Sequence, residues 1–291
     1  RPDYLFTELG GQVGYQNPIT WVLVVAALVA WFRRRQFLDR PRGRLLLLIA
    51  LPLWLVFTGF SLFRSTLPHW TGPAYLTLIL LAATHQAWRE ARSGEEAVAR
   101  PIPWAIKAPV ALVAVLLLLV TGLITSAPTS FGRAEPETRL GEGDPTMDMY
   151  GWRQIRAGFT EVADRDRESG RMAPDAPLLS YRWFPAAHVD YYVATPLGRD
   201  LLAAGTLNAV HKYYWINDLR GGLRPGEDAY YVAVSNWYED PEVAFGHLFE
   251  QIEAAPDTIR VRRRGAPVRN ALVYRLRGYN GGPLVPDVPA P

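Results

Sequence analysis

The 291-residue chain contains no cysteine, which excludes disulfide scaffolds, thiolate metal sites and cysteine nucleophiles. Lysine is almost absent as well, because only Lys107 and Lys212 stand among 31 basic residues. The average composition, 49% hydrophobic and 20% charged, excludes a disordered or collagen-like chain. That average hides two unlike halves: long apolar runs dominate residues 1–127, whereas residues 128–291 are polar and mixed.

The apolar runs of the first half have lengths typical of membrane-spanning helices. Such a helix needs about 20 apolar residues to cross a hydrocarbon core about 30 Å thick. Four runs approach or meet that length, and apart from two histidines near the ends of the third run they contain no ionisable side chain. They are Pro18–Phe32, Leu45–Phe63, Pro68–Trp88 and Pro109–Ala127. Buried helices of a soluble core are the alternative, but four such runs are difficult to bury in 127 residues. We therefore predict four transmembrane helices.

The basic residues predict an orientation. Six arginines and one aspartate separate the first two runs, and three arginines and Lys107 separate the last two. On the opposite side the short segments carry only Arg1 and Arg64. The positive-inside rule then places the arginine-rich loops in the cytoplasm of a bacterium. Residues 1–17, the turn at Arg64 and the C-terminal half would face outward from the inner membrane. The pI near 9.2 is explained by these loops, and no nucleic-acid partner is predicted.

The outward turn at Arg64 has the features of an anion site. Pro68 suits the first turn of a helix, and Ser65 or Thr66 could cap that helix. A guanidinium beside the free N–H groups of a helix start can bind an anion, and at a membrane surface the obvious anion is a lipid phosphate. Alternatively, Arg64 reaches the headgroups without specificity, with Trp70 as an interfacial aromatic. The spacing alone leaves both interpretations open.

The same turn carries a resemblance to a known family. The stretch Arg64–Tyr75, RSTLPHWTGPAY, resembles a late transmembrane turn of bacterial glycosyltransferases of the dolichyl-phosphate-mannose–protein mannosyltransferase-like group, which includes aminoarabinose transferases of lipid A. Its members often have a basic residue, a short gap, then proline and an aromatic residue at this place. Leu9–Pro18 and Ser180–Tyr192 are also similar to segments of these proteins. The resemblance spans most of the chain but rests on short motifs.

This resemblance implies a GT-C fold and an integral-membrane enzyme. Such enzymes move a sugar from a polyprenyl-phosphate donor to an extracytoplasmic protein, lipid or glycan. The resemblance implies that Arg64 and His69 bind the donor phosphate and that Gln12, Trp70 and Tyr75 lie at the mouth of the pocket. The family's catalytic acid lies in its first outward loop, and no residue here matches it. Since the chain starts with arginine and has no targeting segment, we expect it to be the C-terminal part of a longer protein.

The polar half predicts a small soluble α/β domain over residues 150–280. Residues 128–149, rich in proline, glycine and acids, predict a linker, and residues 281–291 a loose tail with four prolines. We expect helices at Tyr150–Glu168, Ala186–Ala194 and Glu242–Ile252. The expected strands are Leu178–Trp183, Asn208–Ile216, Ala229–Ser235, Thr258–Arg262 and Ala271–Leu276, the last two as a hairpin around Gly265–Asn270.

Several motifs of this half are weak. Asp164-Arg165-Asp166 has the DxD form of nucleotide-sugar enzymes, but its charged surroundings favour a solvated helix end. The five histidines lack metal-ligand spacing, so no cofactor is evident, although a divalent cation at the donor site stays possible. The run Arg262–Arg264 could meet anionic headgroups, but a solvated strand edge is favoured.

One cluster of the polar half is a candidate for acceptor or sugar contacts. Arg182, Trp183, His188 and Tyr191 combine aromatic faces, which stack on sugar C–H surfaces, with polar tips that bind hydroxyl groups. A half-buried strand and turn with amphipathic side chains is the alternative, and the pattern favours it.

Two functions from different classes remain. The first is the membrane glycosyltransferase. The second is a non-catalytic, membrane-anchored periplasmic binding or assembly module, which is suggested by the lack of an acid–base constellation. A transporter is a distant third, because no ionisable residue lies deep inside an apolar run.

Overall fold

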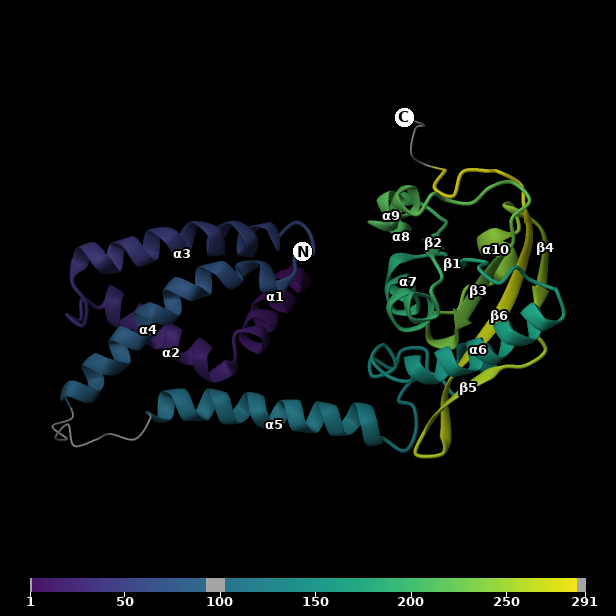
Figure 1. The fold of residues 1–291 in the computed structure, drawn as a ribbon. Coiled ribbons are helices and arrows are strands. Elements are labelled where there is room, and N and C mark those ends of the chain that lie inside the picture. The colour runs from purple at the N-terminus through teal and green to yellow at the C-terminus, as the bar shows by residue number, and fades with distance from the viewer. Residues whose placement is uncertain (1, 93–102, 287–291) are drawn as a thin grey trace. The chain divides into compact units, whose positions relative to one another are not determined.

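The computed structural model describes residues 2–92 and 103–286 (Figure 1). The chain divides into two compact units, Arg1–Leu119 and Val120–Pro291. In its described part the first unit is helical, whereas the second is built on a six-stranded sheet.

Helices α1 to α5 form the first unit, and α5 continues into the second. They are α1 (Pro2–Tyr15), α2 (Pro18–Phe32), α3 (Arg40–Phe60), α4 (Gly72–Arg92) and α5 (Trp104–Ser126), with a 3₁₀ turn at Pro68–Thr71 before α4. Polar caps and prolines set two of the starts. The Asn17 side chain accepts a hydrogen bond of 3.0 Å from the Ile19 N–H, directly before Pro18. The Asp39 carboxylate accepts one of 3.2 Å from the Arg42 N–H.

Helix α4 packs against both α2 and α3. Its buried face contains Leu78 and Leu81, which meet Ala27 of α2 and Ala50 of α3 in one core cluster. Small residues let the helices approach closely. A Cβ atom on Gly43 would lie 2.2 Å from the Trp31 ring, so the start of α3 needs glycine at this contact.

Two described helices, α3 and α5, are long and apolar enough to cross a membrane. A third span exists if α1 and α2, which meet at an angle of 106°, together form one crossing. The expectation of four spans is not confirmed. Helix α2 alone has 15 residues, about 22 Å at 1.5 Å per residue, which is shorter than the hydrocarbon core. Helix α4 is long enough, but Thr84, His85 and Gln86 make its second half polar.

The sheet of the second unit contains both parallel and antiparallel strand pairs. Its strands follow the order β2-β1-β3-β6-β4, and β5 also pairs with β6. Strand β1 is parallel to β2 and β3, whereas β6 is antiparallel to β3, β4 and β5. The strands are β1 (Leu178–Ser180), β2 (Leu201–Ala203), β3 (Ala229–Val234), β4 (Phe249–Ala254), β5 (Ile259–Arg263) and β6 (Ala266–Tyr279).

Both faces of the sheet are covered. Along β3, Tyr230 and Val232 belong to one core cluster, and their neighbour Tyr231 belongs to the other. The first cluster includes the predicted apolar face of α6 (Trp152–Glu168), and the second includes Phe245 of α10 (Pro241–Phe245). The other helices are α7 (Trp183–Val189), which continues as a π-helical turn through Ala194, α8 (Leu207–Val210) and α9 (Tyr213–Leu219).

Several predicted elements differ from the structure. The predicted strand Asn208–Ile216 is helical, because it forms α8 and α9. The predicted helix Glu242–Ile252 is helical only at its start and ends within β4. Strand β2 was not predicted.

The predicted linker and tail are also packed against the fold. In the linker, Asp144 and Met147 are buried. The structure describes the predicted loose tail as far as residue 286. Within this part, Val285 is buried, and the Leu284 carbonyl accepts a hydrogen bond of 2.8 Å from the Gly205 N–H. Residues 287–291 of that tail lie outside the described part.

Candidate functional site

The turn between α3 and α4 presents Arg64 on the surface of the first unit. Within the described chain, no hydrogen bond or ion pair engages its guanidinium. Pro68 starts the 3₁₀ turn, as predicted, but neither Ser65 nor Thr66 caps it. The hydroxyl of Thr66 instead donates a hydrogen bond of 2.9 Å to the Glu8 carboxylate. The start of this turn therefore has no side-chain cap, and an exposed cation lies four residues before it.

Gln12 and Tyr75, predicted at the pocket mouth, are instead buried and bonded to each other. The Gln12 side-chain oxygen accepts hydrogen bonds from the Tyr75 hydroxyl (3.0 Å) and from the Trp54 indole N–H (2.8 Å). Its amide donates to Glu8 (3.0 Å) and to the Thr58 hydroxyl (3.3 Å). This buried polar network joins α1, α3, α4 and the Arg64 turn.

Helix α1 also holds the turn by close packing. A Cβ atom on Gly11 would lie 2.2 Å from the Pro68 ring, so only glycine permits this contact. The Tyr15 ring lies 5.6 Å from the ring of His69, which is exposed. The backbone that carries Arg64 and His69 is thus fixed by side chains of α1 and does not depend on loop residues alone.

An open apolar groove of about 600 Å³ lies next to the 3₁₀ turn. Its lining combines two exposed side chains of the predicted site, His69 and Trp70, with apolar residues of α3 and α4: Leu53, Phe57 and Pro73. The Trp70 ring packs at 5.5 Å from Phe57 and is 40% exposed. The groove thus lies beside the C-terminal half of α3.

In the second unit, the four predicted contact residues belong to one network of aromatic contacts. His188 stacks between Trp152, at 4.9 Å, and Tyr192, at 6.2 Å. Tyr192 meets Tyr191, which is 71% exposed. The Phe184 ring contacts the rings of Trp183, His188 and Trp237. The Arg182 guanidinium lies 5.3 Å from the centre of the Trp237 ring.

The inner end of this network is charged and buried. The guanidinium of Arg269 lies 4.3 Å from the Trp152 ring and donates to the carbonyl of Met147 at 2.6 Å. Burial lowers the pKa of Arg269 to about 9, so the side chain stays protonated at neutral pH. Burial also lowers the pKa of His188, although the nearby Asp148 opposes this shift. The imidazole is therefore neutral at pH 7, and its ring stacks as an uncharged aromatic.

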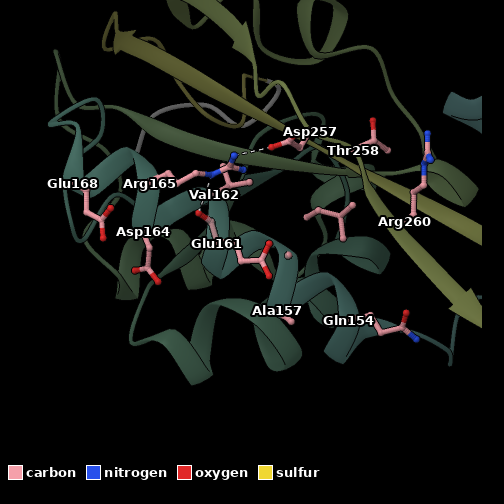
Figure 2. Close-up of a pocket in the computed structure, with 12 residues that line it drawn as sticks. Gln154, Ala157, Glu161, Val162, Asp164, Arg165, Glu168, Asp257, Thr258 and Arg260 are labelled. Carbon is pink, nitrogen blue, oxygen red and sulfur yellow. Dashed lines mark hydrogen bonds and ion pairs between the residues drawn. The ribbon is translucent and has the colours of Figure 1, made fainter.

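A second hollow of the same unit lies between α6 and β5 (Figure 2). It is an open cleft of about 790 Å³, and Arg165 reaches across it to Asp257 at 2.7 Å. Figure 2 shows Glu161, Asp164 and Glu168 along the exposed side of α6. None of the residues that line the cleft is aromatic, so it lacks the stacking surface that a sugar site favours.

The two acids of the DxD motif face different environments. Asp164 lines the cleft and pairs with Arg167 at 3.0 Å. Asp166 is buried and pairs with Arg275 at 2.7 Å, and it also accepts from the Tyr230 hydroxyl at 3.0 Å. The motif is therefore structural. Asp166 is buried, whereas the sequence favoured a solvated helix end for both acids. Within residues 2–92 and 103–286, no group of three or more His, Asp and Glu side chains could hold a metal ion.

The sequence did not point to Glu8, which is 1% exposed, as part of the first-unit site. A signal was present, because Glu8 and Gln12 are four residues apart and lie on the same face of a helix. The sequence predicted only that residues 1–17 face outward and did not predict a helix there. No such signal exists for Arg269, because the two carbonyl groups that it binds, those of Met147 and Tyr150, lie more than 100 residues earlier in the chain.

No protein-family model matches the chain, and no curated protein or solved structure shows significant similarity to it. Two or three helices able to cross a membrane are joined to a unit with a mixed sheet.

Proposed function

We propose that the chain is part of an integral-membrane glycosyltransferase that takes a sugar from a polyprenyl-phosphate donor, in line with the resemblance of Arg64–Tyr75 to the mannosyltransferase-like group. One observation carries the proposal. An exposed arginine without an ion-pair partner among the described residues shares a turn with His69 and Trp70, which line an open apolar groove. A guanidinium suits a phosphate, and an apolar groove suits the attached hydrocarbon chain.

The fixed backbone around Arg64 supports this role. Departure of the sugar leaves negative charge on the lipid phosphate, and a cation already in place stabilises that charge without reorganisation. The Glu8–Thr66 hydrogen bond and the Gly11–Pro68 contact hold the turn in place. His69 and Trp70 would then contact the donor at the groove. Gln12 and Tyr75 would act behind the surface by stabilising the turn.

In the second unit, the exposed rings of Trp183 and Tyr191 are the surfaces that could stack on an acceptor glycan. Arg182 and His188 are half-buried within the same ring network and would support these surfaces. We place the unit on the outer face of a bacterial inner membrane, where such acceptors occur. This placement requires the topology predicted from the arginine-rich loops.

The test is donor binding by the full protein in nanodiscs, with a polyprenyl phosphate that carries a photo-crosslinking group. Arg64→Ala removes a charge-assisted contact and should weaken binding about tenfold or more. Arg42→Ala is the matched control, because Arg42 is also exposed but lies at the opposite end of α3. Equal crosslinking by both variants, with unchanged thermal stability, would remove Arg64 from the donor site.

A non-catalytic binding or assembly module is the second candidate, and Glu8 favours it. This carboxylate lies next to the Arg64 turn, but it is buried and already accepts hydrogen bonds from Gln12 and Thr66. It is therefore not placed to activate an acceptor hydroxyl. Incubation of the full-length protein with a radiolabelled polyprenyl-phosphate sugar and a cell-envelope extract separates the two candidates. Binding of the donor without any transfer would favour the module.

A further inference from the structure

The hairpin between β5 and β6 ends in a tight turn with two exposed arginines. Arg263 pairs with Ala266 across a two-residue connection, and both connecting residues have positive φ, 50° at Arg264 and 84° at Gly265. This is the geometry of a type I′ turn, which gives a rigid tip. Arg262 and Arg264 are exposed, and neither forms an ion pair with a described residue.

The arginine between them fastens the hairpin to the last turn of α5. Arg263 is completely buried and donates to the Ile124 carbonyl at 3.1 Å and to the Thr129 carbonyl at 2.6 Å. A cation at a helix carboxyl end is stabilised by the free carbonyl groups and the helix dipole. The hairpin tip is therefore held at the end of α5, and both belong to the second unit.

The position of this contact follows from the length of α5. Its 23 residues span about 34 Å at 1.5 Å per residue, slightly more than the hydrocarbon core. If α5 crosses the membrane, its last turn lies at the level of the lipid headgroups. Arg262 and Arg264 then also lie at the level of the headgroups, because Arg263 holds their hairpin against Ile124.

Exposed apolar side chains accompany the arginines. Phe131 is 58% exposed and Met149 is 70% exposed, and both lie in segments that contact the hairpin. The Phe131 N–H donates at 2.9 Å to the Asp144 carboxylate, which lies 3.9 Å from the Arg263 guanidinium. The hydroxyl of Tyr150, next to Met149, donates to the Arg262 carbonyl at 3.2 Å. Apolar side chains with adjacent arginines are typical of interfacial membrane anchors.

We propose that Phe131, Met149, Arg262 and Arg264 form a docking surface for anionic phospholipid headgroups, which holds the second unit against the membrane around the end of α5. The surface fits headgroups better than a protein partner because its place next to an apolar helix is fixed by Arg263. It also presents two positive charges without local counter-charges. The proposal depends on α5 crossing the membrane and does not require glycosyl transfer.

The absence of cysteine permits a direct test, because each single-cysteine variant of the full chain carries one label. An environment-sensitive fluorophore is placed at Phe131→Cys or Met149→Cys, and nitroxide-headgroup lipids measure its contact with the membrane. The control is Leu219→Cys, because Leu219 is 86% exposed and belongs to α9. In Figure 1, α9 lies at the other end of the second unit from the tip of the β5–β6 hairpin. In nanodiscs with phosphatidylglycerol we expect both anchor labels to be quenched, and the Leu219 label to remain bright.

Charge removal tests the arginines, although Arg262→Gln also removes the hydrogen bond of 2.7 Å from the Arg262 guanidinium to the Gly265 carbonyl. Arg262→Gln with Arg264→Asn keeps the hairpin, because Asn-Gly is a favoured type I′ pair. This variant should lose most of the quenching in phosphatidylglycerol discs, since two arginines near an anionic surface contribute about thirtyfold in affinity. The matched control, Lys212→Gln with Arg224→Gln, removes two exposed charges elsewhere and should leave the quenching unchanged.

Three results would overturn the proposal. The anchor labels could be as accessible to aqueous quencher as the Leu219 label. Their quenching could be equal in phosphatidylglycerol and phosphatidylcholine discs, which would exclude headgroup charge. They could also stay shielded from aqueous quencher in lipid-free detergent, which would indicate a second copy of the chain or another protein on this surface.

Discussion

The side chain of Gln12 forms hydrogen bonds with polar groups of other residues between apolar helices. Its oxygen accepts from Trp54 and Tyr75, and its amide donates to Glu8. Gln12→Ala removes these contacts and leaves a carboxylate and two donors buried without them. We expect this variant to lower the free energy of unfolding by about 2–4 kcal/mol.

Thermal unfolding of the full chain in detergent, followed by tryptophan fluorescence, measures the effect. Thr7→Ala on the exposed side of the same helix is the control and should change the melting temperature little. If both variants melt at the same temperature as the parent protein, the network contributes no stability.

His188 makes the stability of the second unit dependent on pH. Burial lowers the pKa of its imidazole, Asp148 opposes this effect, and Arg269 adds to it. Below the ordinary pKa of 6.5, the unfolded chain then binds a proton more readily than the folded one. The stability contributed by the neutral ring is therefore complete above pH 6.5 and is lost as the pH falls through the lowered pKa. We expect the melting temperature of this unit to fall between pH 7 and pH 5.

The variant His188→Phe retains an aromatic ring between Trp152 and Tyr192 but cannot titrate. Its melting temperature should depend less on pH in this range than that of the parent protein. His247→Gln removes an exposed histidine and should leave the dependence unchanged. A pH dependence that survives intact in His188→Phe would assign the effect to another group.

At the scale of elements, two adjacent glycines of α1 give a matched pair of variants. A Cβ atom on Gly11 would lie 2.2 Å from the Pro68 ring, whereas one on Gly10 would meet nothing within 4 Å. Gly10→Ala should stabilise the helix by up to about 1 kcal/mol, because alanine is the better helix former. Gly11→Ala should lower the melting temperature, since α1 must move away from the Arg64 turn.

The same pair tests the link between α1 and the donor site. Gly11→Ala should also weaken crosslinking of the polyprenyl phosphate, whereas Gly10→Ala should bind as the parent protein does. Loss of stability with undiminished crosslinking would show that the position of α1 does not matter for the phosphate site.

Elements with a regular pattern were predictable from sequence. Trp152, Ile155, Phe159 and Val162 recur at helical spacing, and all four are buried in α6. The region of α9 was predicted as a strand because aromatic side chains favour sheets. Tyr213 and Asn217 are the buried residues there, and their spacing of four is helical. The composition of this aromatic-rich segment did not indicate which of its side chains would be buried against the sheet.

Contacts between distant residues limited the prediction of the site. The exposed Arg64 turn was visible in the sequence because proline, arginine and aromatic residues lie within a few positions. The burial of Gln12 was not, because Trp54 and Tyr75 come from other helices. In the same way, the composition of residues 128–149 indicated a linker, whereas Arg263 and Arg269 of the β5–β6 hairpin hold this segment against the sheet.

At the scale of the whole molecule, α4 decides which side of the membrane the second unit occupies. Helices α3 and α5 are each able to cross a membrane, and the α1–α2 pair adds a third crossing if it forms one span. If α4 also crosses, the second unit and the Arg64 turn share one side, as the loop arginines predict. If α4 does not cross, these two parts lie on opposite sides. Pairing with α2 and α3 could let α4 cross despite its polar second half, because its buried face contains His85.

Cysteine labelling with a membrane-impermeant maleimide distinguishes these arrangements. Single cysteines replace Gln36 in the arginine-rich loop, Ser65 beside Arg64 and Leu219 in the second unit, all of them exposed in the structure. In intact cells we expect Ser65→Cys and Leu219→Cys to react, and Gln36→Cys to react only after the membrane is permeabilised. If Leu219→Cys behaves like Gln36→Cys, then α4 does not cross. The rings of Trp183 and Tyr191 could then not meet a sugar that is released at Arg64, and the acceptor role of the second unit would be excluded.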